Sequence, residues 1–372
     1  MAGSIKKDGN SWYFVLDLGK DQLTGKRIQK KKRGFKTKKE AQAALVETLN
    51  ELNKGTYIPQ VKTLYKDYLN EWFTDKKTKI QPSTYSTYKW LIDKYIIEYL
   101  GNIELSKLTP MILQRFYNEL SNAGNIVPEN IQKIHSLINN SLKRAERWGL
   151  LNRNVAALVD RPKSVKKEIE VWSLEEAKQF LKVALEDRLY IAFLLAVTTG
   201  MRQAEILGLR WKDVNFEDSS ISVIQTLSHD GKTLKIGTKT KSGMRKVHLP
   251  LESIQHLMKH KRIVERERSQ NGPLYENNDL IVCTSFGTPI IPRNLMRTFY
   301  RLIKTADVKK IRFHDIRHTH ATLLLMQGVN PKIVAERLGH SDIRMTLDTY
   351  SHLLPSMQQE TASKFGAMLF NN

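Results

Sequence analysis

Two connectors divide this 372-residue sequence into three segments that we expect to fold as separate domains. The first connector, residues 55–59 (Gly-Thr-Tyr-Ile-Pro), interrupts a helical pattern, and the second, residues 152–167, is polar and basic. Glycine, proline and polar residues in such stretches are typical of the linkers between domains. We therefore predict domains at residues 1–58, 62–160 and 168–372, in keeping with roughly 150 residues per domain.

The first segment predicts a small α+β domain. Residues 11–18 alternate as a strand does, a second polar strand is expected near residues 26–32, and a capping box at residues 37–40 opens a helix. Between Lys26 and Lys39, nine of fourteen residues are basic and none is acidic. A solvated basic arm is the simpler interpretation, but aromatic residues give the segment a core, which favours a sheet that binds DNA. The predicted DNA-binding residues are Lys26, Arg27, Lys30, Lys31, Lys32, Arg33 and Lys36.

The other two segments are mainly helical. Residues 62–160 show helical periodicity throughout, with an aromatic stripe that includes Trp90 and Tyr95 and that we assign to the core. The third segment is mostly helical but holds three short alternating stretches at residues 220–226, 233–239 and 244–249, of which the last two are expected to pair as a hairpin. The fold class is therefore multidomain and mainly α. It comprises a small α+β amino-terminal domain, an all-α middle domain and a mixed α/β third domain with a three-stranded sheet.

The amino-acid composition indicates what kind of partner the protein binds. Lys and Arg number 60 against 38 Asp and Glu, a formal charge of +22, and so large an excess is typical of proteins that bind a polyanion. The single cysteine, Cys283, excludes an internal disulfide and a cysteine-based zinc site. No apolar run approaches the roughly 18 residues of a membrane span, and the start has no apolar signal core. We expect a cytoplasmic protein that binds nucleic acid and not a membrane.

Four parts of the third segment carry polar residues that core packing does not explain. Gly200 is expected to end one helix and Arg202 to begin the next, where backbone N–H groups favour an anion. Glu205 lies one helical turn further on, placed to orient the Arg202 guanidinium. The remaining candidates are Lys239 and Lys241 near a hairpin tip, His314 and Arg317 on one helix face, and His340 followed by Tyr350.

Two simpler interpretations of these parts stay open at this point. His314 and His318 have the i, i+4 spacing of metal ligands, although Asp315, the carboxylate needed to complete such a site, points elsewhere on the helix. Residues 330–346 also resemble the helix-turn-helix of a repressor-like DNA reader. That pattern leaves the two arginines and Tyr350 unexplained.

Together, the order Arg…Lys…His-x-x-Arg…Leu-Gly-His…Tyr resembles that of the tyrosine recombinase (phage integrase) family. Its parts lie far apart in fixed order, which makes a chance match improbable. The resemblance covers residues 168 to about 360, while residues 62–160 resemble the family's helical, SAM-like core-binding domain and residues 1–60 its arm-type DNA-binding domain. The matching residues are Arg202, Lys239, His314, Arg317, His340 and Tyr350.

The resemblance implies a role for each residue and requires no metal or other cofactor. Tyr350 would be the nucleophile on the scissile phosphate, Arg202 and Arg317 would stabilise the transition state, and Lys239 would be the general acid. Lys241 is the alternative acid, but the Lys-Thr pair at 239–240 matches the family better. His314 would serve as base or proton relay, His340 would bind a phosphate oxygen, and Glu205 would support Arg202.

The family resemblance also implies a cellular function and a set of partners. The chain would be a site-specific DNA recombinase that integrates and excises a mobile element through a 3′-phosphotyrosine intermediate. Its partners would be double-stranded DNA attachment sites, three further copies of itself in a tetramer, an excisionase and a host DNA-bending protein. It would act on the nucleoid of a bacterial host. The alternatives are a resolvase, a topoisomerase-like nicking-closing enzyme, and a DNA-binding regulator without cleavage activity.

Overall fold

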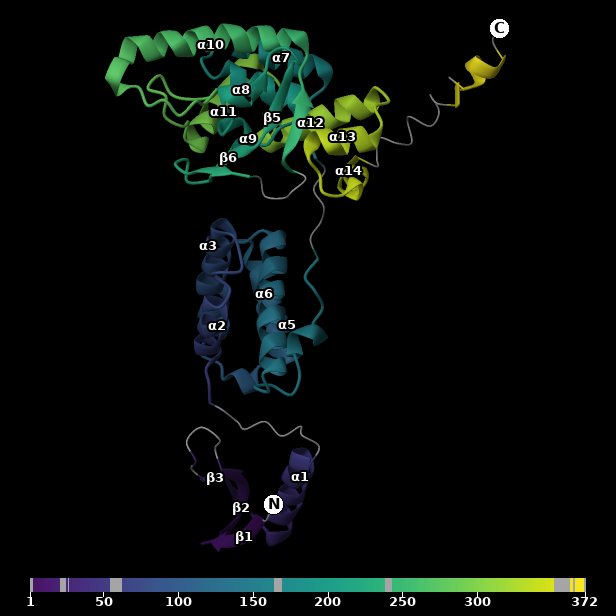
Figure 1. Ribbon diagram of the computed structural model, residues 1–372. Helices are drawn as coiled ribbons and strands as arrows, with labels where there is room; N and C mark the ends of the chain where they lie inside the picture. The colour runs from purple at the N-terminus through teal and green to yellow at the C-terminus, as the bar shows by residue number, and fades with distance from the viewer. Residues whose placement is uncertain are drawn as a thin grey trace. The chain divides into compact units, whose positions relative to one another are not determined.

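The computed structural model describes residues 3–20, 25, 27–53, 62–163, 169–237, 243–350, 362–363 and 365–370 (Figure 1). The chain divides into two compact units, Met1–Lys166 and Lys167–Asn372. This division falls at the end of the polar connector predicted from the sequence. Lys26, Lys239 and Lys241 lie outside the described residues.

The amino-terminal part of the first unit is an antiparallel sheet covered by one helix. Strands β1 (Gly3–Asp8), β2 (Ser11–Lys20) and β3 (Arg27–Phe35) pair in that order, and helix α1 (Lys38–Asn53) packs on them. Phe14 and Leu16 of β2 are fully buried with Leu45 of α1, because alternate residues of a strand face the same side. The sequence did not predict β1, whose lone apolar residue, Ile5, leaves almost no alternating pattern.

The rest of the first unit is a helical bundle with its own core (Figure 1). Pro110 at the first helical position and the Thr109 side chain, which accepts a hydrogen bond from the backbone N–H of Ile112, fix the start of α5 (Pro110–Ala123). Trp90 is 44% exposed, so its assignment to the core was wrong, whereas its neighbour Tyr95 is buried. The segments are α2 (Tyr65–Thr74), α3 (Pro82–Leu91), the π-helix η1 (Ile92–Ile97), α4 (Glu98–Leu100), η2 (Leu105–Lys107), α5 (Pro110–Ala123), α6 (Pro128–Arg147) and η3 (Val155–Leu158).

The second unit is built around α8 (Tyr190–Thr199), whose apolar sequence is buried on nearly every side. A capping box between Ser173 and Glu176 starts the preceding helix, α7 (Leu174–Ala184). Within the described residues, no helix is both long enough and apolar enough to cross a membrane. The other helices are α7 (Leu174–Ala184), α9 (Gln203–Leu207), η4 (Trp211–Asp213), α10 (Leu251–Asn271), η6 (Gly272–Leu274), α11 (Pro292–Ala306), α12 (Phe313–Met326), α13 (Pro331–Leu338) and α14 (Ile343–Tyr350).

The strands of the second unit pair differently from the sequence prediction. The three-stranded sheet consists of β4 (Val214–Asn215), β5 (Ser220–Val223) and β8 (Arg245–His248), while β6 (Gln225–Leu227) pairs with β7 (Leu234–Ile236). The predicted hairpin between the last two stretches was therefore wrong. The turn before β7 explains the difference, because the Asp230 carboxylate accepts hydrogen bonds from the backbone N–H groups of Lys232 and Thr233 and closes β6 onto β7.

Candidate active site

Arg202 and Glu205 form a fixed pair at the start of α9. Gly200 ends α8 in the left-handed conformation (φ 65°), so the chain turns sharply into α9. The Arg202 backbone N–H donates to Glu205 Oε2 over 2.9 Å, and its Nη1 donates to Glu205 Oε1 over 2.8 Å. The Arg202 side chain remains 39% exposed although Glu205 is buried. Glu205 therefore orients the guanidinium from the protein interior, while the guanidinium itself stays accessible from solvent.

Glu205 is held ionised by two arginines. Burial would raise the pKa of this carboxyl, but hydrogen bonds and charge from Arg245, and then from Arg202, outweigh burial and lower the pKa below its usual value. One carboxylate thus faces two guanidinium groups, which leaves a net positive charge at the site. That excess charge suits a phosphate.

Arg317 and His314 come from the first turns of α12. Arg317 is buried, and its Nη1 donates to the carbonyl oxygen of Gly200 over 2.9 Å. His314 lines a hollow of about 500 Å³ together with Arg202. Burial and then the positive charge of Arg317 lower the pKa of His314, so at neutral pH its imidazole is neutral and able to accept a proton.

His340 lies in the turn between α13 and α14. Gly339 adopts the left-handed conformation that ends α13, and His340 Nδ1 is 2.8 Å from the Oγ1 of Thr346, a fully buried residue of α14. Burial, followed by the charges of Arg317 and Arg202, lowers the pKa of His340 to about 4. His340 therefore lies within electrostatic reach of both arginines.

The structure places the backbone of Tyr350 but says nothing of its side chain. Helix α14 begins after the His340 turn and ends at Tyr350, four residues after Thr346. Helices α13 and α14 are joined by a short turn, in agreement with the alternative helix-turn-helix interpretation of residues 330–346. Lys239, the remaining predicted site residue, lies outside the described residues.

Helix α12 carries two further histidines, His318 and His320. The ring of His318 meets the ring of His314 edge-on, with centroids 5.2 Å apart, and burial followed by the neighbouring His314 lowers the pKa of His318 to about 4. His320 faces the other way, with Nδ1 2.9 Å from the carbonyl oxygen of Val197 in α8. His320 therefore packs α12 on α8, and only His318 borders the site.

Sequence reasoning missed two arginines, Arg245 of β8 and Arg337 of α13. Arg245 donates to Glu205, and Arg337 donates to the carbonyl oxygen of Thr198. A signal for Arg245 was present in the sequence, because it stands two residues before Val247 and strand residues two apart share a face. Val247 is buried, so an arginine on its face needs acceptors inside the protein.

Six of the seven predicted DNA-binding residues lie in β3 or directly after it. Lys31 Nζ lies 3.8 Å above the centre of the Tyr13 ring on β2, while Arg33 is within 3.9 Å of Asp8. Arg27 is paired with Asp17, and Lys36 follows the strand. Since Val15 pairs with Lys31 and Phe14 with Lys32, Lys31 shares the sheet face opposite the one that α1 covers. Lys30 and Lys32 precede and follow Lys31 in the strand and so lie on the other face of the sheet. Lys26 lies outside the described residues.

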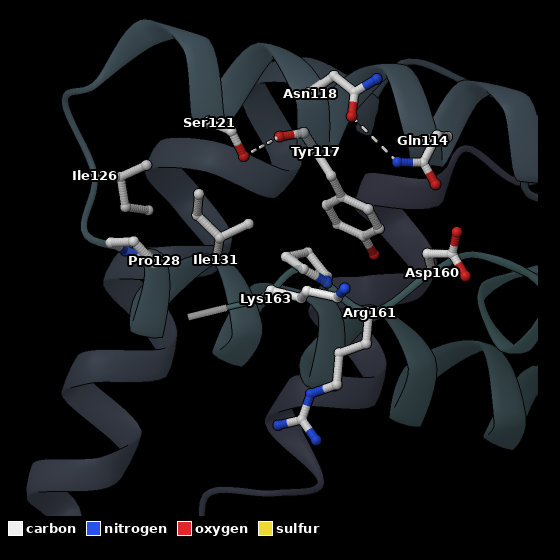
Figure 2. A pocket seen from close by; sticks show the side chains of 11 residues that line it. Gln114, Tyr117, Asn118, Ser121, Ile126, Pro128, Ile131, Asp160, Arg161 and Lys163 are labelled. Atoms are coloured by element: carbon white, nitrogen blue, oxygen red, sulfur yellow. Dashed lines mark hydrogen bonds between the residues drawn. The ribbon is translucent and has the colours of Figure 1, made fainter. Parts of the chain in front are cut away.

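A second hollow, of about 520 Å³, lies in the helical bundle of the first unit (Figure 2). Helices α5 and α6 and the connector at residues 160–163 line it, and Gln132 of α6 holds the connector through the carbonyl oxygen of Pro162. Figure 2 shows Tyr117 among the residues lining it; its hydroxyl lies 3.2 Å from Nδ1 of the buried His135. The hollow contains none of the predicted site residues.

The second unit therefore gathers two arginines, two histidines and a buried carboxylate beside a short helix that ends in tyrosine. Such a group can bind a phosphodiester and stabilise additional negative charge on it. This arrangement is typical of an enzyme that transfers phosphoryl groups of DNA. Comparisons with known proteins identify the family to which it belongs.

Three family descriptions match consecutive parts of the chain. The phage integrase family matches residues 170–357, an arm DNA-binding domain matches residues 4–52, and the SAM-like amino-terminal domain of phage integrases matches residues 64–121. A tyrosine recombinase XerC-like protein of Caldanaerobacter subterraneus is 31% identical, over 95% of each chain. The ICEBs1 integrase of Bacillus subtilis is 27% identical, over 98% of this chain and all of its own.

Solved structures agree on the fold. The Tn1549 transposon integrase in complex with a circular intermediate DNA has a TM-score of 0.67 at 18% identity, covering 80% of this chain and 99% of its own. A lambda integrase dimer bound to a core site has a TM-score of 0.60 at 17% identity, covering 92% and 93%. The chain belongs to the phage integrase family of tyrosine recombinases. It is an enzyme of site-specific DNA recombination.

Proposed function

We propose that this recombinase cuts and rejoins attachment-site DNA through a covalent link to Tyr350. The Tyr350 hydroxyl oxygen bonds to the scissile phosphorus, the bond from phosphorus to the 5′-oxygen breaks, and the 5′-hydroxyl leaves with a proton. The resulting 3′-phosphotyrosine conserves the energy of the broken phosphodiester, so rejoining needs no high-energy cofactor. Attack by the 5′-hydroxyl of a second strand reverses the step and completes the exchange.

Arg202 and Arg317 are proposed to stabilise the pentacoordinate transition state. Each guanidinium donates hydrogen bonds to the non-bridging oxygens and keeps its charge at any relevant pH. The contact of Glu205 with Arg202, and that of Gly200 with Arg317, support this role because they fix both groups before DNA binds. Preorganisation of this kind avoids a reorganisation cost during reaction.

The histidines and the lysine are proposed to move protons and bind phosphate. Neutral His314 takes the proton of the Tyr350 hydroxyl, while Lys239 supplies the proton that the leaving 5′-oxygen requires. His340 donates a hydrogen bond from Nε2 to a phosphate oxygen, since Nδ1 is engaged with Thr346. The depressed pKa of His314 supports its role as proton acceptor.

The remaining parts are proposed to select and assemble the DNA. Residues 1–58 bind arm-type sites through β3, residues 62–160 bind the core site, and residues 168–372 carry out the chemistry in the cytoplasm on the host nucleoid. We propose a homotetramer on paired sites, joined by an excisionase and a host DNA-bending protein. Residues 365–370 support assembly, because Phe365, Met368 and Leu369 are helical and exposed, which suits docking on a neighbouring copy.

The single observation that carries the proposal is that one turn positions both arginines, because Arg202 follows the Gly200 turn and Arg317 donates to the carbonyl oxygen of Gly200 over 2.9 Å. It brings together two distant segments of the sequence, and His314, three residues before Arg317, lines the same hollow as Arg202. The test is a nicked suicide substrate followed by denaturing electrophoresis. Tyr350→Phe should bind DNA as wild type does and form no covalent band, while the control Tyr190→Phe should form the normal band. A persisting band in Tyr350→Phe would overturn the assignment.

A further inference from the structure

Arg245 connects three segments of the second unit through one buried guanidinium. Its side chain is 7% exposed. Nη2 donates to Glu205 Oε2 over 2.9 Å, Nε donates to the carbonyl oxygen of Arg337 over 2.7 Å, and Nη1 donates to the carbonyl oxygen of Gly243 over 3.1 Å. A planar guanidinium with donors in a fixed fork can serve three acceptors at once, which an ammonium group cannot do with the same geometry.

Two of the acceptors belong to segments with a proposed role in the reaction. Glu205 holds Arg202, and Arg337 stands three residues before His340 at the end of α13. The third acceptor, Gly243, lies two residues before Arg245 itself. Arg245 therefore contacts the supports of the transition-state arginine and of the phosphate-binding histidine.

A further contact of Arg337 links this hydrogen-bond network to the end of α8. Arg337 also donates from Nη2 to the carbonyl oxygen of Thr198 over 2.9 Å, at the end of α8. Two residues later, the carbonyl oxygen of Gly200 accepts from Arg317, and the chain then enters Arg202. The path from Arg202 through Glu205, Arg245 and Arg337 thus returns to the turn that positions Arg202 and Arg317.

We propose that Arg245 is a positioning residue of the strand-cleavage reaction, holding Arg202 and His340 in fixed positions relative to each other. This inference rests on the proposed roles of those two residues. Arg245 also balances the charge of Glu205, which leaves the positive charge of Arg202 available to the phosphate. Without Arg245, Glu205 pairs with Arg202 alone and weakens its interaction with DNA phosphate in the transition state.

The test compares Arg245→Lys and Arg245→Gln with Arg210→Lys in the full-length protein. Arg210 is a matched control because it is also a partly buried arginine that pairs with a carboxylate, Asp213, at 2.7 Å. Single-turnover cleavage of a suicide substrate and DNA affinity are measured for each protein. The temperature is one at which circular dichroism shows each variant folded to the wild-type extent. Cleavage by both Arg245 variants should slow by about 10²-fold, as expected for misplaced catalytic groups, with DNA affinity changed less than about threefold. Arg210→Lys should cleave at close to the wild-type rate.

A double-variant measurement separates positioning from a general loss of structure. The losses of Arg245→Lys and Glu205→Gln should combine to less than their product, because both act on Arg202. Wild-type cleavage by folded Arg245 variants, or a loss confined to DNA affinity, would overturn the inference. A covalent band from Tyr350→Phe would instead overturn the proposed function.

Discussion

Arg317 donates a hydrogen bond to the backbone carbonyl oxygen of Gly200, over 2.9 Å and across 117 positions of the sequence. A backbone acceptor cannot change rotamer, so the position of this guanidinium depends on the path of the chain at the end of α8. The same turn leads directly into Arg202. The separation of the two arginines is thereby fixed by main-chain geometry.

Gly200→Ala should therefore damage both stability and catalysis. A Cβ at this position would lie 2.6 Å from Leu338 Cδ2 and 2.8 Å from His320 Cδ2, at a φ of +65°. Left-handed strain and overpacking together should cost about 2–5 kcal/mol, measured by urea unfolding of the full chain. Gly328→Ala is the control, since its φ is +79° with nothing within 4 Å, and it should lose only the strain energy. Equal losses in the two variants would contradict the close packing at Gly200.

Local signals in the sequence predicted local structure well. The cap at Thr37 that opens α1 and the helix end at Gly200 were confirmed, because each depends on residues within one turn of the chain. The set of arginine, lysine, histidine and tyrosine residues predicted the family for a different reason. Phosphoryl transfer through a tyrosine needs these residue types, whereas core packing does not.

Pairing over longer distances was not predictable in the same way. The strand β8 pairs with β5 across a chain segment that contains a separate hairpin, and alternation alone does not reveal the partner of a strand. The role of Arg245 was missed because two of its three acceptors, the Glu205 carboxylate and the Arg337 carbonyl group, lie 40 and 92 positions away in the sequence. Trp90 was misassigned because a stripe of aromatic residues does not show where the stripe ends.

Thr346→Val should slow strand cleavage without weakening DNA binding. The substitution keeps the shape of a fully buried side chain but removes the hydroxyl that lies 2.8 Å from His340 Nδ1. Loss of one hydrogen bond of about 1 kcal/mol should reduce the single-turnover rate about fivefold. Thr48→Val, which removes a buried hydroxyl of α1, is the matched control and should cleave core-site DNA normally. An unchanged rate in Thr346→Val would show that this contact does not orient His340.

The stability of the free protein should fall as the pH drops from about 6.5 toward 4. Burial and nearby charges lower the pKa of His318 and His340 to about 4, below the value of about 6.5 in an unfolded chain. In that interval the unfolded chain binds protons that the folded chain does not, so acid favours unfolding. Urea unfolding at pH 7.5 and pH 5 measures the effect.

The histidine variants test the origin of this pH dependence. His318→Gln/His340→Gln should lose less stability between the two pH values than wild type, whatever its stability at pH 7.5. The exposed His229 supplies the control, since His229→Gln should keep the wild-type dependence. An undiminished dependence in the double variant would assign the effect to other groups.

Lys239→Ala should lose far more cleavage rate than Lys241→Ala. A general acid contributes about 10²–10⁴-fold, whereas a lysine that contacts a phosphate mainly affects affinity. A substrate with a bridging 5′-sulfur should restore cleavage by Lys239→Ala, because its leaving group needs no proton. Rescue of Lys241→Ala alone would assign the acid to Lys241.

Removal of residues 1–58 should leave cleavage of core-site DNA intact and abolish recombination of a full attachment site. The basic strand β3 lies in a small domain with its own core, separate from the residues that carry the chemistry. Each phosphate contact adds about 0.9 to the slope of log affinity against log salt, so the isolated domain should show a slope of several units.

Paired charge variants distinguish recognition from simple attraction. Lys31→Ala/Arg33→Ala removes two charges from β3, where Lys31 lies over the Tyr13 ring, and should reduce the preference of the full chain for arm-site over random DNA. Lys6→Ala/Lys7→Ala removes the same charge from β1 and should lower affinity for both DNAs alike. Affinities are measured at several salt concentrations, because charge loss changes the salt dependence in either case. If both pairs lower affinity equally and neither alters the preference, β3 does not read the arm site, and residues 1–58 act only as a basic tail.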